Sequence, residues 1–160
     1  MRIFMIAAAV LLTASAAQAQ DMKSDVLAVH NAERALVGAE PLQWDDGLAA
    51  GAQTWANHLA DISSLVHSDT PEGENLWMGS AGAYGYASMA QTWADEKSQF
   101  SNGVFPDVST SGNWADVGHY TQMVWSGTTH VGCALASNAS WDILVCRYAN
   151  PGNVVGQQPY

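Results

Sequence analysis

Gly118-His119-Tyr120-Thr121-Gln122-Met123-Val124-Trp125 is the stretch of this 160-residue chain that says most about its fold. Together with the two residues before it, this octad predicts a short helix over 116–125. Its apolar residues recur at helical spacing, so one face of the helix is expected to point into the protein. The inward residues on that face are Val117, Tyr120 or Thr121, and Val124.

A second informative stretch lies near the end of the chain and reads Ile143-Leu144-Val145-Cys146-Arg147-Tyr148-Ala149-Asn150-Pro151-Gly152-Asn153. It overlaps a predicted strand over 141–148, which is rich in residues favoured in β-strands. Another strand is predicted over 130–136, and the four residues 137–140 between the two strands are expected to form a turn. The end of the domain is therefore expected to be a β-hairpin, followed by a polar tail over 151–160.

Earlier in the chain, apolar periodicity predicts helices over 21–37, 45–62 and 87–100. The first of them has an apolar stripe made of Val26, Val29 and Ala32, with Leu36 further on. An extended link is expected over 41–44, and the periodicity is lost over 63–84 and 101–113, which we expect to be long loops. Long loops inside compact domains are often functional. The sequence shows no internal repeat and no second domain.

These stretches resemble the paired signatures of the CAP superfamily, which comprises the cysteine-rich secretory, antigen 5 and pathogenesis-related 1 proteins. The segments 30–34 and 131–134 match the family as well, so the resemblance covers 26–153. It implies an α+β fold, a three-layer α-β-α sandwich with a small central antiparallel sheet, in one domain over 20–160. The chain departs from the family pattern at Asn150, where a proline is usual, and in having one cysteine pair where many relatives have three or more.

In CAP domains two histidines and two glutamates line a central cleft. The resemblance places them here in four short motifs, His67-Ser68, Gly73-Glu74-Asn75, Trp93-x-x-Glu96 and Gly118-His119-Tyr120. We call these four residues the cleft tetrad: His67, Glu74, Glu96 and His119. Trp77 and Trp114 fall in expected loops and are candidates for an aromatic rim of the cleft. The other histidines are expected to pack or face solvent, with His30 and Arg34 tying the first helix to the core.

Two neutral imidazoles beside two carboxylates suit a divalent ion such as zinc. His67 and His119 would ligate directly, and the glutamates would either ligate or orient the rings from behind. Two alternatives stay open, namely a purely structural hydrogen-bond network and a catalytic role. From motifs alone enzymes are disfavoured, since there is no His-Glu-x-x-His, no Cys-x-x-Cys and no Gly-x-Ser-x-Gly.

Cys133 and Cys146 are the only two cysteines. Each belongs to one strand of the expected hairpin, and an exported protein meets conditions in which a disulfide persists. We therefore expect one bridge between them. The alternative is that the two cysteines are free or catalytic thiols.

Residues 1–19 have the layout of a secretory signal peptide: Arg2, an apolar run over 3–12, then small residues ending in Ala19. Cleavage after Ala19 would leave a mature chain that begins at Gln20, in the extracellular space or the periplasm. An uncleaved membrane anchor is the alternative. The apolar run is shorter than the roughly 20 residues that a membrane-spanning helix requires, so no transmembrane segment is expected.

Charge excludes some partners. The whole chain has a formal net charge of −10, with 15 acidic residues against five lysines and arginines. A chain of this charge repels phosphate backbones and offers no basic patch for nucleic acid. Anionic membrane surfaces are excluded on the same ground.

The leading functional hypothesis is a secreted, monomeric, non-enzymatic binding module. Its ligand would be a small apolar molecule such as a sterol or fatty acid, or a protein partner, with an optional divalent ion in the cleft. The alternative is a metal-dependent hydrolase or protease that uses the same tetrad, with metal-bound water as nucleophile. A third possibility is a purely structural or defence-type interaction protein, as in the plant relatives.

Overall fold

A computed structural model describes the backbone of residues 4–160 and the side chains of residues 21–160. The predicted signal peptide, 1–19, lies outside the residues whose side chains are described, and its cleavage stays a prediction. Among the helices described, none is long and apolar enough to cross a membrane. The elements in chain order are α1 (Phe4–Val37), β1 (Gln43–Trp44), α2 (Asp46–Ile62), β2 (Gly73–Ser80), α3 (Tyr86–Asp95), the 3₁₀ turns η1 (Glu96–Gln99) and η2 (Trp114–Asp116), α4 (Gly118–Val124), β3 (His130–Ser137) and β4 (Trp141–Ala149).

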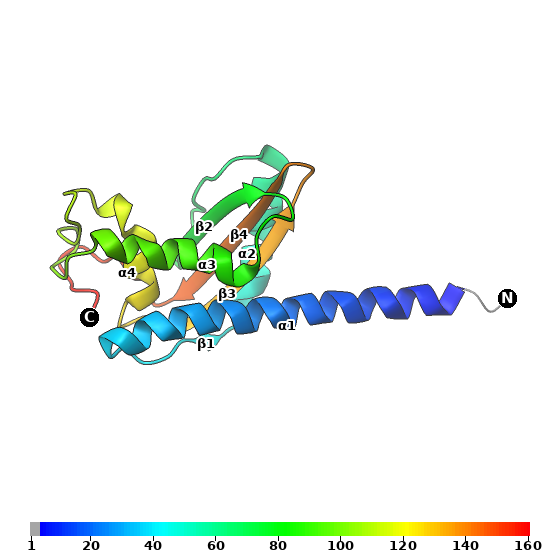
Figure 1. The fold of residues 1–160 in the computed structure, drawn as a ribbon, viewed down its shortest axis with the longest axis horizontal. Helices are drawn as coiled ribbons and strands as arrows, with labels where there is room; N and C mark the ends of the chain where they lie inside the picture. The colour runs from blue at the N-terminus through cyan, green and yellow to red at the C-terminus, as the bar shows by residue number, and fades with distance from the viewer. Residues whose placement is uncertain (1–3) are drawn as a thin grey trace.

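The elements form three layers, which confirms the expected α-β-α sandwich. The middle layer is a four-stranded sheet in the order β1-β3-β4-β2. Helix α2 packs on β3 and β4 from one side, and α1, α3 and α4 pack together on the other side (Figure 1). The three long strands pair antiparallel, while the two-residue β1 adds a parallel edge beside β3.

Alternation along the hairpin strands separates the two sides of the core. Leu144 and Tyr148 of β4 face the three-helix layer, whereas Ile143 and Val145 face α2. On β3 the α2 side includes Gly132, where a Cβ atom would overlap the backbone of Ala49 and Asp45. The absence of a side chain at this position lets the start of α2 lie directly on the sheet.

The predicted disulfide is present. Cys133 and Cys146 lie opposite each other in the β3–β4 register, are bonded, and are buried in the core on the three-helix side. No free cysteine remains, since these are the only two in the chain.

Helix α1 buries a different face from the one its apolar residues predict. Val26 is fully buried as expected, but Leu36 is 75% exposed, and the inward positions further along are taken by His30 and Arg34, both fully buried. The predicted stripe is confirmed at Val26 and in part at Val29, which is half-buried against the core, and it was wrong at Ala32 and Leu36, which are exposed. Apolar periodicity cannot find this face because its polar side chains are satisfied by hydrogen bonds inside the protein.

The segment 63–84 is only partly a loop. It contains β2, which pairs with β4 over its whole length from Gly73 to Ser80. The expectation of a loop was wrong because β2 is bounded by glycine and serine and has buried residues in succession, so polar and apolar residues do not alternate along it. Helix α1 begins at Phe4 and is longer than the helix expected over 21–37. Elsewhere within residues 38–160 the differences are small: α3 tightens into η1 at Glu96, and η2 precedes α4.

The guanidinium of Arg34 joins several elements in the centre of the protein. Its nitrogens donate to the carbonyl oxygens of Glu40, Met123, Trp125 and Thr128 over 2.6–3.0 Å. Burial lowers the pKa of Arg34. These four acceptors take the place of water around the buried charge and connect the end of α1, the end of α4 and the segment that leads to β3.

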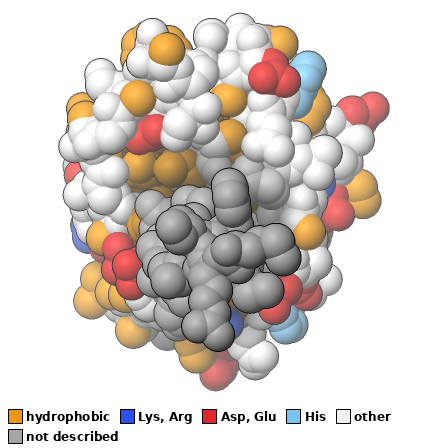
Figure 2. All heavy atoms as spheres, turned by 90° about the vertical axis from the view of Figure 1, so that its right-hand side faces the viewer, with side chains coloured by type: hydrophobic (Ala, Val, Ile, Leu, Met, Phe, Trp, Pro, Cys, Tyr) orange, Lys and Arg blue, Asp and Glu red, His pale blue; other side chains and the backbone are white. Residues whose placement is uncertain are grey.

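Two further cations pair with carboxylates. The Nζ of Lys97, whose side chain is 43% exposed, lies 2.7 Å from Glu33 Oε1, and the side chain of Arg147 is 12% exposed with its Nε 3.9 Å from Glu74 Oε2. Acidic side chains are scattered over the face shown in Figure 2, where lysine and arginine side chains cover only small areas. Arg34 and Arg147 are thus enclosed, while many carboxylates lie on the surface.

The Arg34→Lys substitution keeps the charge but loses the planar fork of donors. We expect it to lower the free energy of unfolding by about 3 kcal/mol, because carbonyls are left unpaired beside a buried charge. Urea denaturation at pH 7 measures this. Lys23→Gln on the same helix is the control and should change stability by less than about 0.5 kcal/mol. Equal effects of the two substitutions would contradict the role given to Arg34.

Candidate functional site

The first histidine–glutamate pair joins the loop after α2 to the start of β2. His67 Nδ1 lies 2.8 Å from Glu74 Oε1, and the backbone N–H of Ser68 donates to the same oxygen over 2.9 Å. The hydroxyl of Ser68 donates to Glu74 Oε2 over 2.6 Å. The Glu74 side chain is 6% exposed, whereas that of His67 is 66% exposed. A buried carboxylate thus holds an imidazole that faces solvent.

The second pair joins η1 to the first turn of α4. His119 Nδ1 lies 2.6 Å from Glu96 Oε1, and the backbone N–H groups of His119 and Tyr120 both donate to Glu96 Oε2, over 3.0 and 3.1 Å. The imidazole also stacks on Trp93, with ring centroids 6.0 Å apart. No side chain of its own segment caps α4, so Glu96 does so from a different element.

These contacts determine which nitrogen of each ring is free. A carboxylate can only accept, so Nδ1 of both histidines carries the hydrogen and Nε2 of the neutral ring is left as a lone-pair donor. Glu74 and Glu96 each accept three hydrogen bonds. Both oxygens of each carboxylate are thus engaged by hydrogen-bond donors of the protein.

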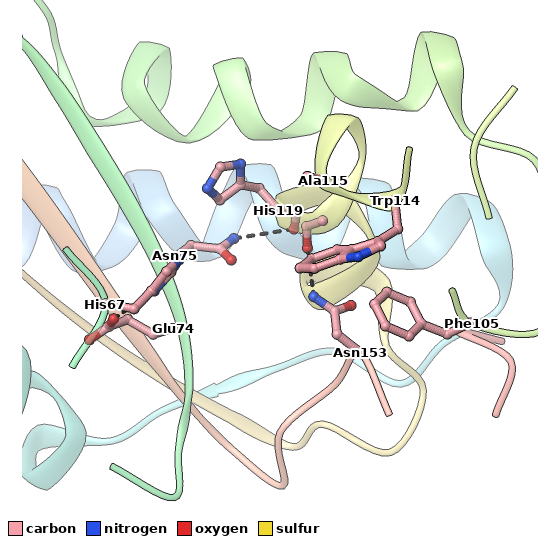
Figure 3. Close-up of a pocket in the computed structure, with 9 residues that line it drawn as sticks. His67, Glu74, Asn75, Phe105, Trp114, Ala115, His119 and Asn153 are labelled. Carbon is pink, nitrogen blue, oxygen red and sulfur yellow. Dashed lines mark hydrogen bonds and ion pairs between the residues drawn. The ribbon is translucent and has the colours of Figure 1, made fainter. Parts of the chain in front are cut away.

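A cleft of about 430 Å³ opens between the two pairs (Figure 3). Its polar end is formed by His67, Glu74 and His119, and its other end by the rings of Phe105 and Trp114, whose centroids are 5.3 Å apart. The remaining lining residues are Asn75, Ala115, Gly118 and Asn153. Three members of the cleft tetrad thus line one cavity, and Glu96 stands behind His119.

The tetrad does not form one compact metal cluster. Among the residues with described side chains, no three histidine, cysteine, aspartate or glutamate side chains converge as a metal centre would require. The structure instead shows two separate histidine–glutamate pairs. Only the two Nε2 atoms are free to ligate, while the carboxylates are engaged with Nδ1.

Of the two tryptophans considered for the rim, one is there. Trp114 lines the cleft and is 46% exposed, but Trp77 is 9% exposed and lies in the core on β2. Trp77 was misplaced because β2 was not recognised as a strand. His58 is exposed and stacks on Trp55, and His130 lies next to Thr129, so both stay outside the cleft as expected.

Sequence reasoning missed five lining residues, of which Phe105, Asn75 and Asn153 contribute large or polar side chains and Ala115 and Gly118 do not. Phe105 and Asn153 come from a loop and the tail, where no periodicity gives a signal. The tail was expected to wrap or to hang loose, and it wraps: Phe105 N donates to Gln157 O over 2.8 Å and Ser126 N to Pro159 O over 2.7 Å. Asn75 stood in the quoted Gly73-Glu74-Asn75 motif without a role.

Comparison with known proteins places this geometry in context. A profile of the cysteine-rich secretory protein family (CAP) matches residues 27–148. Pathogenesis-related protein 1B of Nicotiana tabacum is 41% identical over 151 residues, which cover 94% of this chain and 88% of that protein. Pathogenesis-related protein 1 of Arabidopsis thaliana is 39% identical over 144 residues, covering 89% and 85%.

Solved structures share the fold. A crystal structure of NaASP2 with Zn²⁺ superposes with a TM-score of 0.69 at 23% identity, covering 88% of this chain and 85% of that one. A crystal structure of Na-ASP-1 gives a TM-score of 0.72 at 24% identity, covering 88% of this chain and 41% of that one. At these identities the likeness shows the fold alone.

Glu74 controls the titration of His67. The hydrogen bond to Glu74 raises the pKa of His67 above 6.5, against an opposing effect of burial. Burial would raise the pKa of Glu74, but the hydrogen bonds from His67 and Ser68 outweigh it and lower that pKa below 4.5. The His67 contribution to stability is lost as the pH rises through its raised pKa, and the Glu74 contribution is lost as the pH falls through its lowered pKa. The pair therefore stabilises the fold most between pH 4.5 and 6.5.

We expect Glu74→Gln to return the pKa of His67 toward its ordinary value, measured by NMR titration with the exposed His58 as internal reference. The difference in unfolding free energy between wild type and variant should be larger at pH 5.5 than at pH 9. Because His67 is largely exposed, the pH-dependent part should stay below about 1 kcal/mol. A His67 titration that is the same in both proteins would contradict the assignment.

Proposed function

The chain belongs to the cysteine-rich secretory protein family, and from that membership we propose that it is an exported, monomeric binding module whose ligand occupies the cleft between the two histidine–glutamate pairs. It is a pathogenesis-related 1-like protein over nearly its whole length. We propose that residues 1–19 direct export, to the extracellular space or the periplasm, and that 20–160 form the single functional domain. The ligand we propose is a small apolar molecule, a sterol or a fatty acid.

The observation that carries this proposal is the two-ended lining of the cleft. Its volume of about 430 Å³ falls in the range of small-molecule sites. Phe105 and Trp114 give one end an aromatic surface, while the imidazoles at the other end offer two unprotonated nitrogens. An apolar body with one polar end, the general shape of a sterol or fatty acid, matches this division. A protein partner that inserts an apolar side chain is the other occupant compatible with it.

A divalent ion fits the polar end. His67 and His119 would hold it through Nε2, with Glu74 and Glu96 orienting the rings through Nδ1, an arrangement typical of zinc-binding histidines. Zinc in such a place would supply a positive charge for the polar end of a ligand. With two protein ligands the affinity should be modest, since four are usual at structural zinc sites.

Hydrolysis is the less favoured function because no side-chain nucleophile lines the cleft. Among the cleft residues no serine or thiol stands beside the imidazole nitrogens, so a nucleophile would have to be metal-bound water. The two glutamates each hold three hydrogen bonds, which leaves Nε2 of His67 and of His119 as the available bases. Binding requires neither a nucleophile nor a base.

Ligand binding is tested with the mature protein and two fluorescent probes, dehydroergosterol for sterols and parinaric acid for fatty acids. We expect saturable binding of at least one probe at micromolar concentration. Trp114→Ala should weaken it about tenfold, equivalent to 1.4 kcal/mol, by removing the aromatic surface. Trp141→Ala is the matched control, because Trp141 is 38% exposed at the hairpin turn and does not line the cleft.

Equal losses of probe affinity in the two tryptophan variants would show that the ligand binds outside the cleft. If neither probe binds saturably, the proposal of a lipid ligand is refuted. The same preparations are assayed for peptide and ester hydrolysis with zinc present. Turnover in wild type that both Glu74→Gln and Glu96→Gln abolish would establish the hydrolase instead.

Zinc binding is measured by calorimetry near neutral pH. We expect wild type to bind one ion, the His67→Ala/His119→Ala double variant to lose it, and the His58→Ala/His130→Ala double variant to keep it. Affinity should fall as the pH drops and the imidazoles protonate, and the fall should begin above pH 6.5 because the hydrogen bond to Glu74 raises the pKa of His67. Identical heats for wild type and the first double variant would refute zinc binding by these two histidines.

A further inference from the structure

A buried polar chain runs from α1 along the three-helix face of the sheet toward the cleft. His30 is fully buried, with Nδ1 2.8 Å from the carbonyl oxygen of Val26 and Nε2 2.8 Å from the hydroxyl of Tyr148. A carbonyl can only accept, so Nδ1 carries the hydrogen and Nε2 accepts the Tyr148 proton. The direction of the first two hydrogen bonds is thereby fixed.

Asn75 continues this chain to the cleft. It is 1% exposed, and its Nδ2 donates to the carbonyl oxygen of His119 over 3.2 Å (Figure 3). Its side chain also interacts with the hydroxyl of Tyr148. Asn75 therefore has one contact toward the interior and one toward the residue that presents the cleft imidazole.

The position of Asn75 in β2 connects the two histidine–glutamate pairs. Glu74 faces Arg147 in the strand register and holds His67, whereas Asn75 faces Cys146 and holds His119 from the opposite face of the strand. Successive residues of a strand point to opposite faces at a fixed spacing. The first residues of β2 therefore form a rigid spacer between the two imidazoles.

Helix α4 depends on such outside contacts. It is seven residues long and has no cap from its own segment, so its first turn is held by Glu96 at the N–H groups of His119 and Tyr120 and by Asn75 at the His119 carbonyl. Asn153 also donates to the carbonyl oxygen of Gly118 at the start of this turn. Removal of Asn75 would leave the His119 carbonyl without its side-chain partner.

We propose that Asn75 is a positioning residue of the cleft, which sets the place of the His119 imidazole relative to that of His67 by fixing the His119 carbonyl against the buried Tyr148–His30 chain. The consequence for metal binding rests on the proposed function. The positioning role of Asn75 does not rest on it, because the contact with His119 is made in the protein without metal.

The test uses Asn75→Leu, which keeps the shape of the side chain and removes its donors, and Gln122→Leu as a matched control. Gln122 is also a buried amide, 2% exposed, but its bonds go to Thr128 and Gly152 at the far end of α4. Both variants should be less stable than wild type in urea. In metal-free protein, we expect the amide hydrogens of His119 and Tyr120 to exchange about tenfold faster in Asn75→Leu than its global stability explains. Gln122→Leu should show no such excess.

Zinc calorimetry on the same proteins gives the second measurement, with an expected loss of about tenfold in affinity for Asn75→Leu and wild-type affinity for Gln122→Leu. If wild type binds no zinc, the proposed metal site fails, while the exchange experiment still tests the positioning role of Asn75.

The inference is overturned if the exchange rates of the His119 and Tyr120 amides follow only the global stability in both variants. Should Asn75→Leu not fold, Tyr148→Phe, which leaves Asn75 without its inner partner, is measured by the same exchange experiment and should show a smaller excess at the same two amides.

Discussion

The buried guanidinium of Arg34 is the constraint on which the arrangement of helices depends. A charge in the interior is tolerated only if hydrogen bonds replace its hydration. Here four carbonyl oxygens do so, and two of them, on Met123 and Trp125, belong to the end of α4, where a helix leaves its last carbonyls without internal partners. One side chain of α1 thus satisfies the end of a helix that carries His119 at its start.

The cleft follows from this packing together with the edge position of β2. Because β2 is the last strand of the sheet, residues on its two faces can reach one opening around the edge. Glu74 and Asn75 use this geometry to bring His67 from one side and His119 from the other. The site therefore depends on the three-layer packing as a whole, since the loop after α2, the edge strand β2 and the start of α4 all have to lie in the right positions relative to one another.

Much of this could be read from the sequence, and the failures have physical causes. The octad at Gly118, the closing hairpin and the cysteine pair gave clear local signals, and family resemblance brought the cleft tetrad together across the chain. Apolar periodicity failed where buried residues are polar. His30 and Arg34 lie on the inward face of α1, and their polar atoms are hydrogen-bonded inside the protein. It failed again in β2, which lacks alternation. Phe105 and Asn153 had no signal at all, because their positions are set by backbone hydrogen bonds between a loop and the tail.

The placement of the arginines has a consequence for how copies of the protein meet. Arg34 is enclosed and Arg147 is almost enclosed, so neither can pair with a carboxylate of a second molecule. The whole chain has a formal net charge of −10, so at neutral pH two molecules approach as like-charged particles. This repulsion opposes self-association and weakens as salt shortens the Debye length. Near the isoelectric point of about 4.5 the net repulsion vanishes, and the colloidal behaviour of the protein is therefore expected to depend on both pH and salt.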